Sequence, residues 1–241
     1  MTKNNSQKPN ELEFETTKFG YRREPYYKGL EEISKLGYTT EDYIHHFPCF
    51  TGHMNLSRFM ALYECYQNTL GIAGHIAEIG VYKGASLLFL TKLAQIYESE
   101  SLTQVHGFDW FQGTPVDPES REPEGTYKES YERLIQLIKA QSLENAVFVH
   151  KLDVTTELPK FFEKHPHMQF KIVFFDIGLY SVVNTALPIF WERLSKGGYL
   201  ILDQFNHEMA PGETKAVKEF LKDKEIRTFP HTFMPTAYIV K

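Results

Sequence analysis

Four aspartates stand at the ends of short apolar segments. The segments QVHGFDW, AVFVHKLD, FKIVFFD and YLILD have the composition of β-strands, and they end at Asp109, Asp153, Asp176 and Asp203. Ligands of open parallel sheets bind beyond the carboxyl ends of the strands, so these four acids would meet on one rim. A single aspartate in such a place usually only caps a helix or forms a turn, but four together predict a binding site rich in carboxylates.

A glycine-containing turn is expected at the same rim. The stretch HIAEIGVYKGASLLFLTKL, residues 75–93, starts as an apolar strand with Glu78, breaks at Gly80 and Gly84, and continues with leucines at helical spacing. Glycine lets the backbone adopt positive φ or approach a ligand, and the following helix points its first free N–H groups at whatever lies above the turn. The pattern indicates a cradle for a small molecule, although a βα loop that binds nothing has the same form.

The residues in the turn narrow the choice of ligand. A dinucleotide site needs G-x-G-x-x-G, and Tyr82 stands where the second glycine would admit a pyrophosphate; the G-K-[ST] of a P-loop is absent from the sequence. A cationic ligand that carries a ribose fits better. Glu78 would supply negative potential, and Asp109 could accept hydrogen bonds from two vicinal ribose hydroxyls.

The elements that would position these residues alternate regularly after residue 72. Strand-like segments alternate with the helical patterns of residues 130–142, 158–165, 182–198 and 213–223, and IRTFPHT and TAYIVK would form a closing hairpin. Such alternation predicts an α/β fold, a doubly wound sheet that is mostly parallel, with helices on both faces and an antiparallel C-terminal edge. Residues 1–18 are expected to form a disordered tail, and residues 19–71 an N-terminal helical extension.

Bulk properties exclude some partners. The formal charge of −5 and the pI near 6.1 provide no basic surface for nucleic acid or for an anionic membrane. No apolar run approaches the roughly 20 residues needed to cross a bilayer, and the polar start lacks the features of a signal peptide, so a cytoplasmic protein is expected. Cys49 and Cys65 match neither a disulfide framework nor a zinc site.

Several motifs resemble one enzyme family. AEIGVYKGAS is similar to motif I of class I S-adenosylmethionine-dependent methyltransferases, and GFDWFQGTP resembles the D-S-F-x-G-x-P segment of the macrocin-type (TylF/MycF) sugar O-methyltransferases. FFDIGLYSVVNTAL and GGYLILDQFNHEMAPGETKAVKEFL resemble two later segments of that family, in the same order, so the similarity runs from about Asn55 to Lys241. The resemblance implies a Rossmann-like fold with residues 72–241 as the catalytic domain.

The resemblance also implies how S-adenosylmethionine would bind. Gly80 and Gly84 would line the methionine and ribose, Ser86 would hold the carboxylate, Asp109 would take the ribose hydroxyls, and Asp153 would lie near the adenine. The expected cofactor site is completed by Glu78, Tyr82, Trp110 and Asp176.

A divalent metal is a further implication of the family. Its carboxylate positions correspond to Asp176, Asp203 and Gln204, but Gly178 replaces the second acid of D-x-D, and Gln204 replaces the second acid of D-D. Two carboxylates and one amide oxygen still form an all-oxygen set suited to Mg²⁺ or Mn²⁺. We expect metal binding, with a vestigial site as the alternative.

The general base is not obvious from the motifs. Leu179 stands where related catechol-type enzymes carry a lysine, so His207, in the loop after Gln204, is our first candidate, with Asp176 as the second catalytic residue. His45, His46 and Tyr127 are alternatives without support from spacing. Residues 116–128 are polar and rich in Pro and Glu, as expected of a lid or of a plain surface loop.

The resulting functional expectation is methylation of a hydroxyl on a sugar or another small natural-product scaffold, assisted by a metal. The partner would be a polyol-like small molecule, and the protein would be a homodimer or a higher homo-oligomer. Two alternatives stay open: a metal-independent methyltransferase for a phenolic or amine acceptor, and a cofactor-binding fold without catalysis.

Overall fold

The computed structural model describes residues 13–241, and its contacts divide the chain into two compact units, residues 1–53 and residues 54–241. We describe each unit by itself. The boundary lies upstream of the expected one at residues 71–72, because most of the helix that precedes the glycine turn packs with the larger unit. Residues 1–12 of the expected disordered tail lie outside the described residues, whereas Phe14–Phe19 form helix α1 rather than a disordered segment.

The N-terminal unit is helical, as expected. After α1 come the 3₁₀ turn η1 (Gly20–Arg22) and the helices α2 (Arg23–Lys35), α3 (Thr40–His45) and α4 (Phe47–Phe50). Thr39 begins α3 with a capping box, in which its hydroxyl accepts the Asp42 N–H and the Asp42 carboxylate accepts the Thr39 N–H. None of these helices has a buried residue, so the described residues of this unit form no hydrophobic core of their own.

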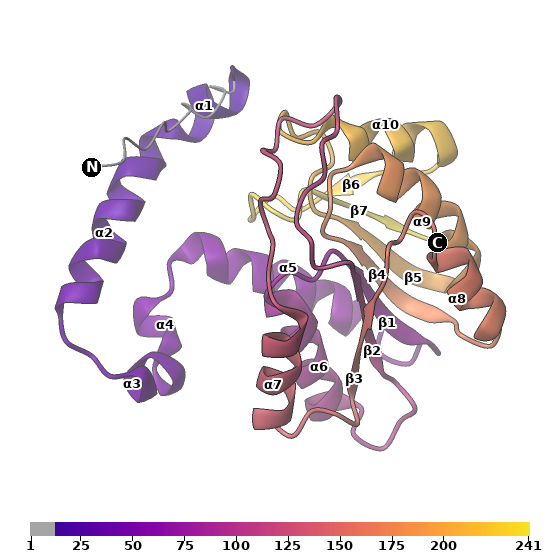
Figure 1. The fold of residues 1–241 in the computed structure, drawn as a ribbon, viewed down its shortest axis with the longest axis horizontal. Coiled ribbons are helices and arrows are strands. Elements are labelled where there is room, and N and C mark those ends of the chain that lie inside the picture. The colour runs from indigo at the N-terminus through magenta and orange to yellow at the C-terminus, as the bar shows by residue number, and fades with distance from the viewer. Residues whose placement is uncertain (1–12) are drawn as a thin grey trace. The chain divides into compact units, whose positions relative to one another are not determined.

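The larger unit is built on one sheet with the strand order β3-β2-β1-β4-β5-β7-β6 (Figure 1). Its strands are β1 (His75–Ile79), β2 (Val105–Asp109), β3 (Val147–Lys151), β4 (Phe170–Phe175), β5 (Leu194–Leu202), β6 (Arg227–Thr228) and β7 (Ala237–Val240). The first five pair in parallel, β7 is antiparallel to β5, and β6 is antiparallel to β7. The predicted α/β class and the antiparallel C-terminal edge are confirmed.

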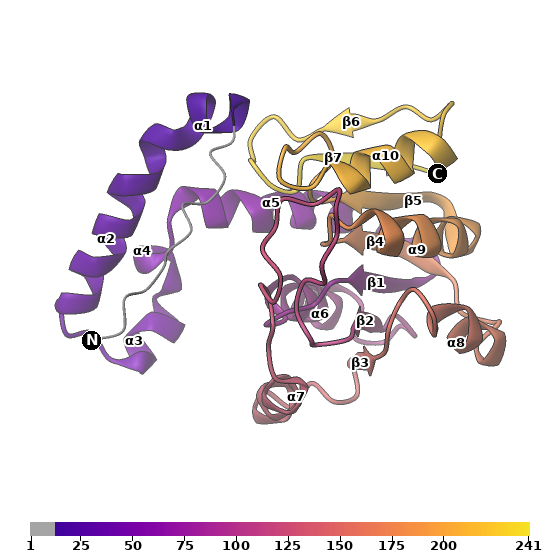
Figure 2. The ribbon, with the colours of Figure 1, turned by 45° about the horizontal axis from the view of Figure 1, so that its top comes forward.

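Helices cover both faces of this sheet. They are α5 (His53–Asn68), α6 (Ala85–Tyr97), α7 (Tyr131–Ala140), α8 (Leu158–Lys164), α9 (Tyr180–Arg193) and α10 (Pro211–Phe220). Figure 2 shows α6 and α7 on one face and α8 and α9 on the other. Both faces are covered because the side chains of β4 are apolar on each side of the sheet. Ile172 and Phe174 belong to the hydrophobic core cluster that includes α5, α6 and α7. Phe170, Val173 and Phe175 belong to the cluster that includes α8, α9 and α10. Among the described residues, no helix is long and apolar enough to cross a membrane.

The sheet topology locates the binding site. β1 pairs with β2 on one side and with β4 on the other, so the order of the strands reverses at β1. Where the strand order reverses, the connections that leave the two neighbouring strands run in opposite directions, and a crevice forms between them at the carboxyl ends of the strands. Glu78, near the end of β1, lies beside this crevice, and the four strand-end aspartates lie along the same edge.

Candidate active site

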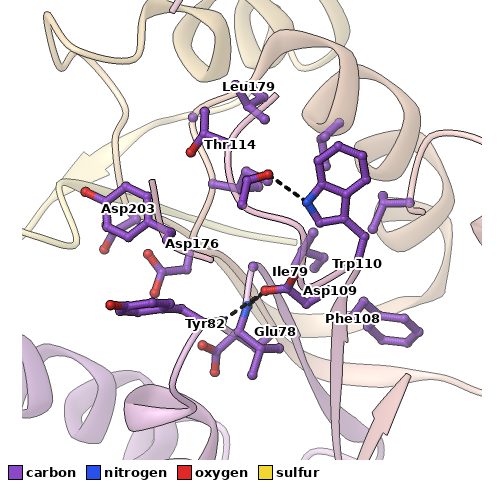
Figure 3. A pocket seen from close by; sticks show the side chains of 18 of the residues that line it. Glu78, Ile79, Tyr82, Phe108, Asp109, Trp110, Thr114, Asp176, Leu179 and Asp203 are labelled. Atoms are coloured by element: carbon purple, nitrogen blue, oxygen red, sulfur yellow. Dashed lines mark hydrogen bonds between the residues drawn. The ribbon is translucent and has the colours of Figure 1, made fainter. Parts of the chain in front are cut away.

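A cavity of about 660 Å³ opens at the carboxyl ends of the strands. Figure 3 shows Trp110 on one side of it and Asp176 and Asp203 on the other. The loop after β3 contributes Asp153 to the lining, and the long loop after β2 contributes Thr114, Glu122 and Tyr127. The cavity also contains most of the residues expected from the sequence: Glu78, Gly80, Tyr82, Ser86, Asp109, Trp110, Asp153, Asp176, Asp203 and Gln204.

The glycine turn is held close to the end of β4. Gly80 has φ +87°, and a Cβ atom there would lie 2.3 Å from the carbonyl oxygen of Asp176, so only glycine fits. Gly84 has a different role from the one expected. It precedes α6 with φ +81°, a Cβ there would lie 2.7 Å from Leu134 Cδ1 in α7, and it is not among the described residues that line the cavity.

Asp109 organises this turn from the neighbouring strand. Its Oδ2 accepts the backbone N–H groups of Val81 (2.8 Å) and Tyr82 (3.0 Å), and its Oδ1 accepts that of Phe111 (2.7 Å). One of these bonds is drawn in Figure 3. A carboxylate has about four lone-pair positions, so Asp109 retains limited capacity for a ligand hydroxyl.

Glu78 is a buried carboxyl in the lining of the cavity. The residue is 1 % exposed, and its Oε2 has no hydrogen-bond partner among the described residues. Burial raises the pKa of the Glu78 carboxyl well above its ordinary value, and the nearby Asp176 raises it further. An unpartnered buried carboxyl is costly, and a bound cationic group would relieve that cost. The cavity therefore fits a small cationic molecule beside Glu78.

The side of the cavity formed by β2 and β3 is less charged. Trp110 lies along it and donates its indole N–H to the Gly113 carbonyl at 2.9 Å. Asp153 turns toward its own loop, where its Oδ1 accepts the N–H (2.8 Å) and the hydroxyl (2.6 Å) of Thr155. Leu152 and Val154 also line this side, which gives it the apolar walls that a planar aromatic group requires.

Asp176 and Asp203 meet at a residue that our sequence analysis did not identify. Arg58, from α5, donates from Nη2 to Asp176 Oδ2 at 2.5 Å and from Nη1 to Asp203 Oδ1. The Asp203 side chain is only 4 % exposed. Burial raises the pKa of the Asp203 carboxyl well above its ordinary range and Asp176 adds to the rise, whereas Arg58 opposes it. The helical spacing could have indicated that Arg58 faces the interior. It lies four residues before Leu62 and seven before Cys65, on the buried face of α5.

Gln204 is held by neighbours on two sides. Its backbone N–H donates to Glu213 Oε2 (2.8 Å), and its side-chain Nε2 donates to Glu122 Oε1 (3.0 Å). Its Oε1 is buried without a hydrogen-bond partner, and a Cβ on Gly178 would lie only 2.1 Å from that atom. Glycine at position 178 is therefore a packing requirement, and an acid would not fit there.

These contacts do not fit the expected Mg²⁺ or Mn²⁺ site. Both expected carboxylate ligands are paired with Arg58, and Gln204 Oε1 would be left as one neutral ligand. Among residues 13–241, His, Cys, Asp and Glu form no group of three or more that could hold a metal ion. Because Arg58 already pairs with both carboxylates, this corner of the cavity suits the guanidinium rather than a divalent cation.

His207, the expected base, is buried outside the cavity lining. Its Nδ1 accepts the Met209 N–H at 3.2 Å, and its ring packs 5.5 Å from that of Phe233. It is absent from the described residues that line the cavity, whereas Tyr127, an alternative candidate, is present. His45 and His46 belong to the N-terminal unit.

The loop expected as a possible lid forms one wall of the cavity. Its two arms are joined by the bonds Thr114 N–H to Thr126 O and Gly125 N–H to Thr114 O, both 2.8 Å. It is tied to the region of α10 by the Arg121 N–H, which donates to Met209 O at 2.9 Å. The loop delivers Glu122 to the cavity, where burial raises the pKa of this carboxyl. Sequence analysis did not single out Glu122, one of several acids in the loop.

Comparison with known proteins agrees with this fold. The crystal structure of CalS11, a calicheamicin methyltransferase, has a TM-score of 0.78 at 21 % identity, over 100 % of this chain and 99 % of that chain. An apo structure of CalS11, described as a TDP-rhamnose 3'-O-methyltransferase, has a TM-score of 0.73 at 21 % identity, over 89 % of this chain and 93 % of that chain. The O-methyltransferase NovP has a TM-score of 0.63 at 19 % identity, over 77 % and 79 % of the two chains. No curated protein matches the sequence.

The strand order, the glycine turn and the row of strand-end acids define a Rossmann-like methyltransferase of class I. The family model for macrocin O-methyltransferase (TylF) matches residues 34–232, and the chain belongs to that family. It is a methyltransferase that depends on S-adenosylmethionine, and the resemblance stated from the motifs is confirmed.

Proposed function

We propose that this protein transfers the methyl group of S-adenosylmethionine to a hydroxyl oxygen of a sugar or a similar polyol on a natural-product scaffold. The observation that carries the proposal is the lining of the cavity, which combines two sets of residues. The first set is the glycine turn, Asp109 and Glu78, and the second set is Asp176, Gln204 and Glu122.

The first set of residues suits the cofactor. We assign the ammonium group of its methionine part to Glu78, which needs a cationic partner, and the ribose to the turn that Asp109 holds. The adenine would lie between Trp110 and the apolar residues Leu152 and Val154. When bound, the cofactor supplies a methyl group on a positively charged sulfur.

The second set of residues suits an acceptor with several hydroxyls. Gln204 Oε1 has no partner, and the hydroxyls of Thr114 and Tyr127 also line this part of the cavity. The amide oxygen can accept a hydrogen bond and the two hydroxyls can donate or accept one, as a sugar requires, whereas a purely phenolic acceptor would leave several of them unpaired. The similarity to CalS11, a TDP-rhamnose 3'-O-methyltransferase, supports the same choice.

The acceptor hydroxyl must lose its proton as it is methylated. Glu122 is the carboxylate best placed to receive it, because it lines the cavity and its carboxylate accepts a hydrogen bond from the neutral amide of Gln204. Burial raises the pKa of Glu122, which makes this carboxylate a stronger base. Asp176 would orient the hydroxyl while Arg58 holds its carboxylate in place.

The experiment has two parts. Calorimetry with S-adenosylhomocysteine tests the cofactor site, and saturable binding is expected. Methyl transfer from labelled S-adenosylmethionine is then compared for a TDP-deoxysugar, a sugar-bearing aglycone, a catechol and a primary amine. We expect transfer to the hydroxyls of the sugars. Transfer to only the catechol or the amine, or no binding of S-adenosylhomocysteine, would refute the proposal.

A further inference from the structure

The contacts of Arg58 explain how the site can dispense with a metal ion. The guanidinium lies between the ends of β4 and β5 and reaches Asp176 at 2.5 Å as well as Asp203. Asp203 is 4 % exposed, and the Arg58 side chain is 21 % exposed. One cation therefore forms ion pairs with two carboxylates from neighbouring strands, as a bridging metal ion would.

Arg58 is held in this position by further contacts. Its Nε and Nη2 both lie 3.4 Å from Ser86 Oγ, at the start of α6, and its guanidinium carbon lies 5.2 Å from the centre of the Phe174 ring. Guanidinium groups stack on aromatic rings and present a rigid planar fork to carboxylates. Contacts from α6, β4 and the two strand ends thus fix one orientation of the side chain.

The neighbouring positions have lost the features of a metal site. Gly178 replaces an acid where a Cβ would meet both Ala210 Cβ and Gln204 Oε1 at 2.1 Å. The Gln204 amide is neutral, and its nitrogen is committed to Glu122. Of the three expected metal ligands only Asp176 and Asp203 carry charge, and both already pair with Arg58.

We propose that Arg58 replaces the divalent cation of this site, so that methyl transfer by this protein requires no metal. The inference rests on the proposed function, because it assigns Asp176 to orienting the acceptor. Arg58 is a positioning residue. Its fork fixes the two carboxylates, and its permanent charge allows Asp203 to remain buried.

The test uses Mn²⁺ as the probe. Electron paramagnetic resonance measures free Mn²⁺ in the presence of the full-length protein, with and without S-adenosylhomocysteine. We expect the wild-type protein to leave the free signal unchanged and its methyl transfer to survive EDTA. In Arg58→Ala the two carboxylates lose their cation, and Mn²⁺ should bind at least ~10-fold more tightly than to the wild-type protein. The double variant R58A/D176N should lose that binding again.

Two further variants test whether the effects of Arg58→Ala come from a general loss of structure. Arg133→Ala removes an ion pair on α7 in which the arginine side chain is 77 % exposed, and it should behave as wild type in every measurement. Arg58→Lys keeps the charge but loses the planar fork. It should bind no Mn²⁺ and should lower kcat, while the affinity for S-adenosylhomocysteine stays unchanged.

The outcomes separate this inference from the proposed function. Saturable Mn²⁺ binding by the wild-type protein that Asp176→Asn abolishes, together with loss of activity in EDTA, would overturn the inference and leave the proposed function intact. A folded R58A that binds S-adenosylhomocysteine but gains no Mn²⁺ would also overturn it. If R58A does not fold, the Mn²⁺ and activity measurements on the wild-type protein and on R58K still test whether Arg58 replaces the metal. Failure of the wild-type protein to bind S-adenosylhomocysteine would refute the proposed function instead.

Discussion

The carboxylate of Asp109 accepts the backbone N–H of Val81 at 2.8 Å, across 28 residues of sequence. This bond joins the end of β2 to the turn that follows β1, and the adjacent bond from the Tyr82 N–H completes a two-point clamp. The clamp determines the shape of the turn before any ligand arrives. The strand-end acid is therefore part of the architecture of the site as well as a candidate ligand-binding group.

Asp109→Ala should weaken the binding of S-adenosylhomocysteine at least ~10-fold, because hydrogen bonds to a charged group contribute about 1.5–3 kcal/mol each. The unfolding free energy should also fall, since the N–H groups of Val81, Tyr82 and Phe111 lose their acceptor. Calorimetry and urea denaturation measure the two effects. Asp223→Ala, at an exposed position, is the matched control, and an unchanged affinity in Asp109→Ala would contradict the assignment.

Glu78→Gln should separate cofactor binding from stability. The amide keeps the shape of the side chain and removes a buried, unpartnered carboxyl, so the melting temperature should stay constant or rise. Affinity for S-adenosylhomocysteine should fall, because the partner of its ammonium group is lost. Thermal denaturation with and without ligand detects both changes, with Glu64→Gln at an exposed site as control. Equal affinity in Glu78→Gln and wild type would exclude this role for Glu78.

Glu122→Gln should lower kcat by ~10²-fold or more, the usual contribution of a general base. The glutamine oxygen can still accept the hydrogen bond from Gln204, so the loop should keep its conformation and cofactor affinity should not change. The acidic limb of the kcat–pH profile should disappear in the variant, because burial raises the pKa of the wild-type carboxyl. Glu124→Gln, on the exposed side of the same loop, provides the comparison. If Glu122→Gln kept the wild-type kcat, Glu122 would not be the general base, and another group would accept the proton.

A pair of histidines should make the fold sensitive to acid. His106 Nδ1 lies 3.1 Å from His150 Nε2, between β2 and β3, so the two rings cannot both be protonated without repulsion. Burial, with a smaller effect from neighbouring histidines, lowers the pKa of His106 to about 3 and that of His150 to about 4.

Because the folded-state pKa values lie below the value of about 6.5 for an unfolded chain, unfolding takes up protons below that pH. Their contribution to stability is present above pH 6.5 and is lost as the pH falls through the folded values. With two protons taken up, the unfolding free energy should drop by up to ~2.7 kcal/mol per pH unit between about pH 6 and pH 4. Urea denaturation across this range measures the slope. The double variant H106F/H150F should flatten it, and His231→Gln, at an exposed position, should not.

Much of the fold follows from local sequence patterns. The alternation of apolar segments and helical patterns predicted the parallel sheet, and TAYIVK predicted the antiparallel edge that β7 forms. The rim of strand-end acids was also predictable, because a parallel sheet places the carboxyl ends of its strands along one edge, however the helices pack on it. The gathering of Asp109, Asp153, Asp176 and Asp203 around one cavity agrees with that expectation.

What the sequence by itself determined was thus the class of fold, the glycine turn and the edge of the sheet that carries the site, since each depends on the periodicity of a short segment. The tertiary structure alone decided which groups meet there. Arg58 is separated from Asp176 by 118 residues and from Asp203 by 145, and Gly84 faces Leu134 of another helix. Those pairings depend on how α5 and α7 pack on the sheet, and the packing of distant segments leaves no local pattern in the sequence.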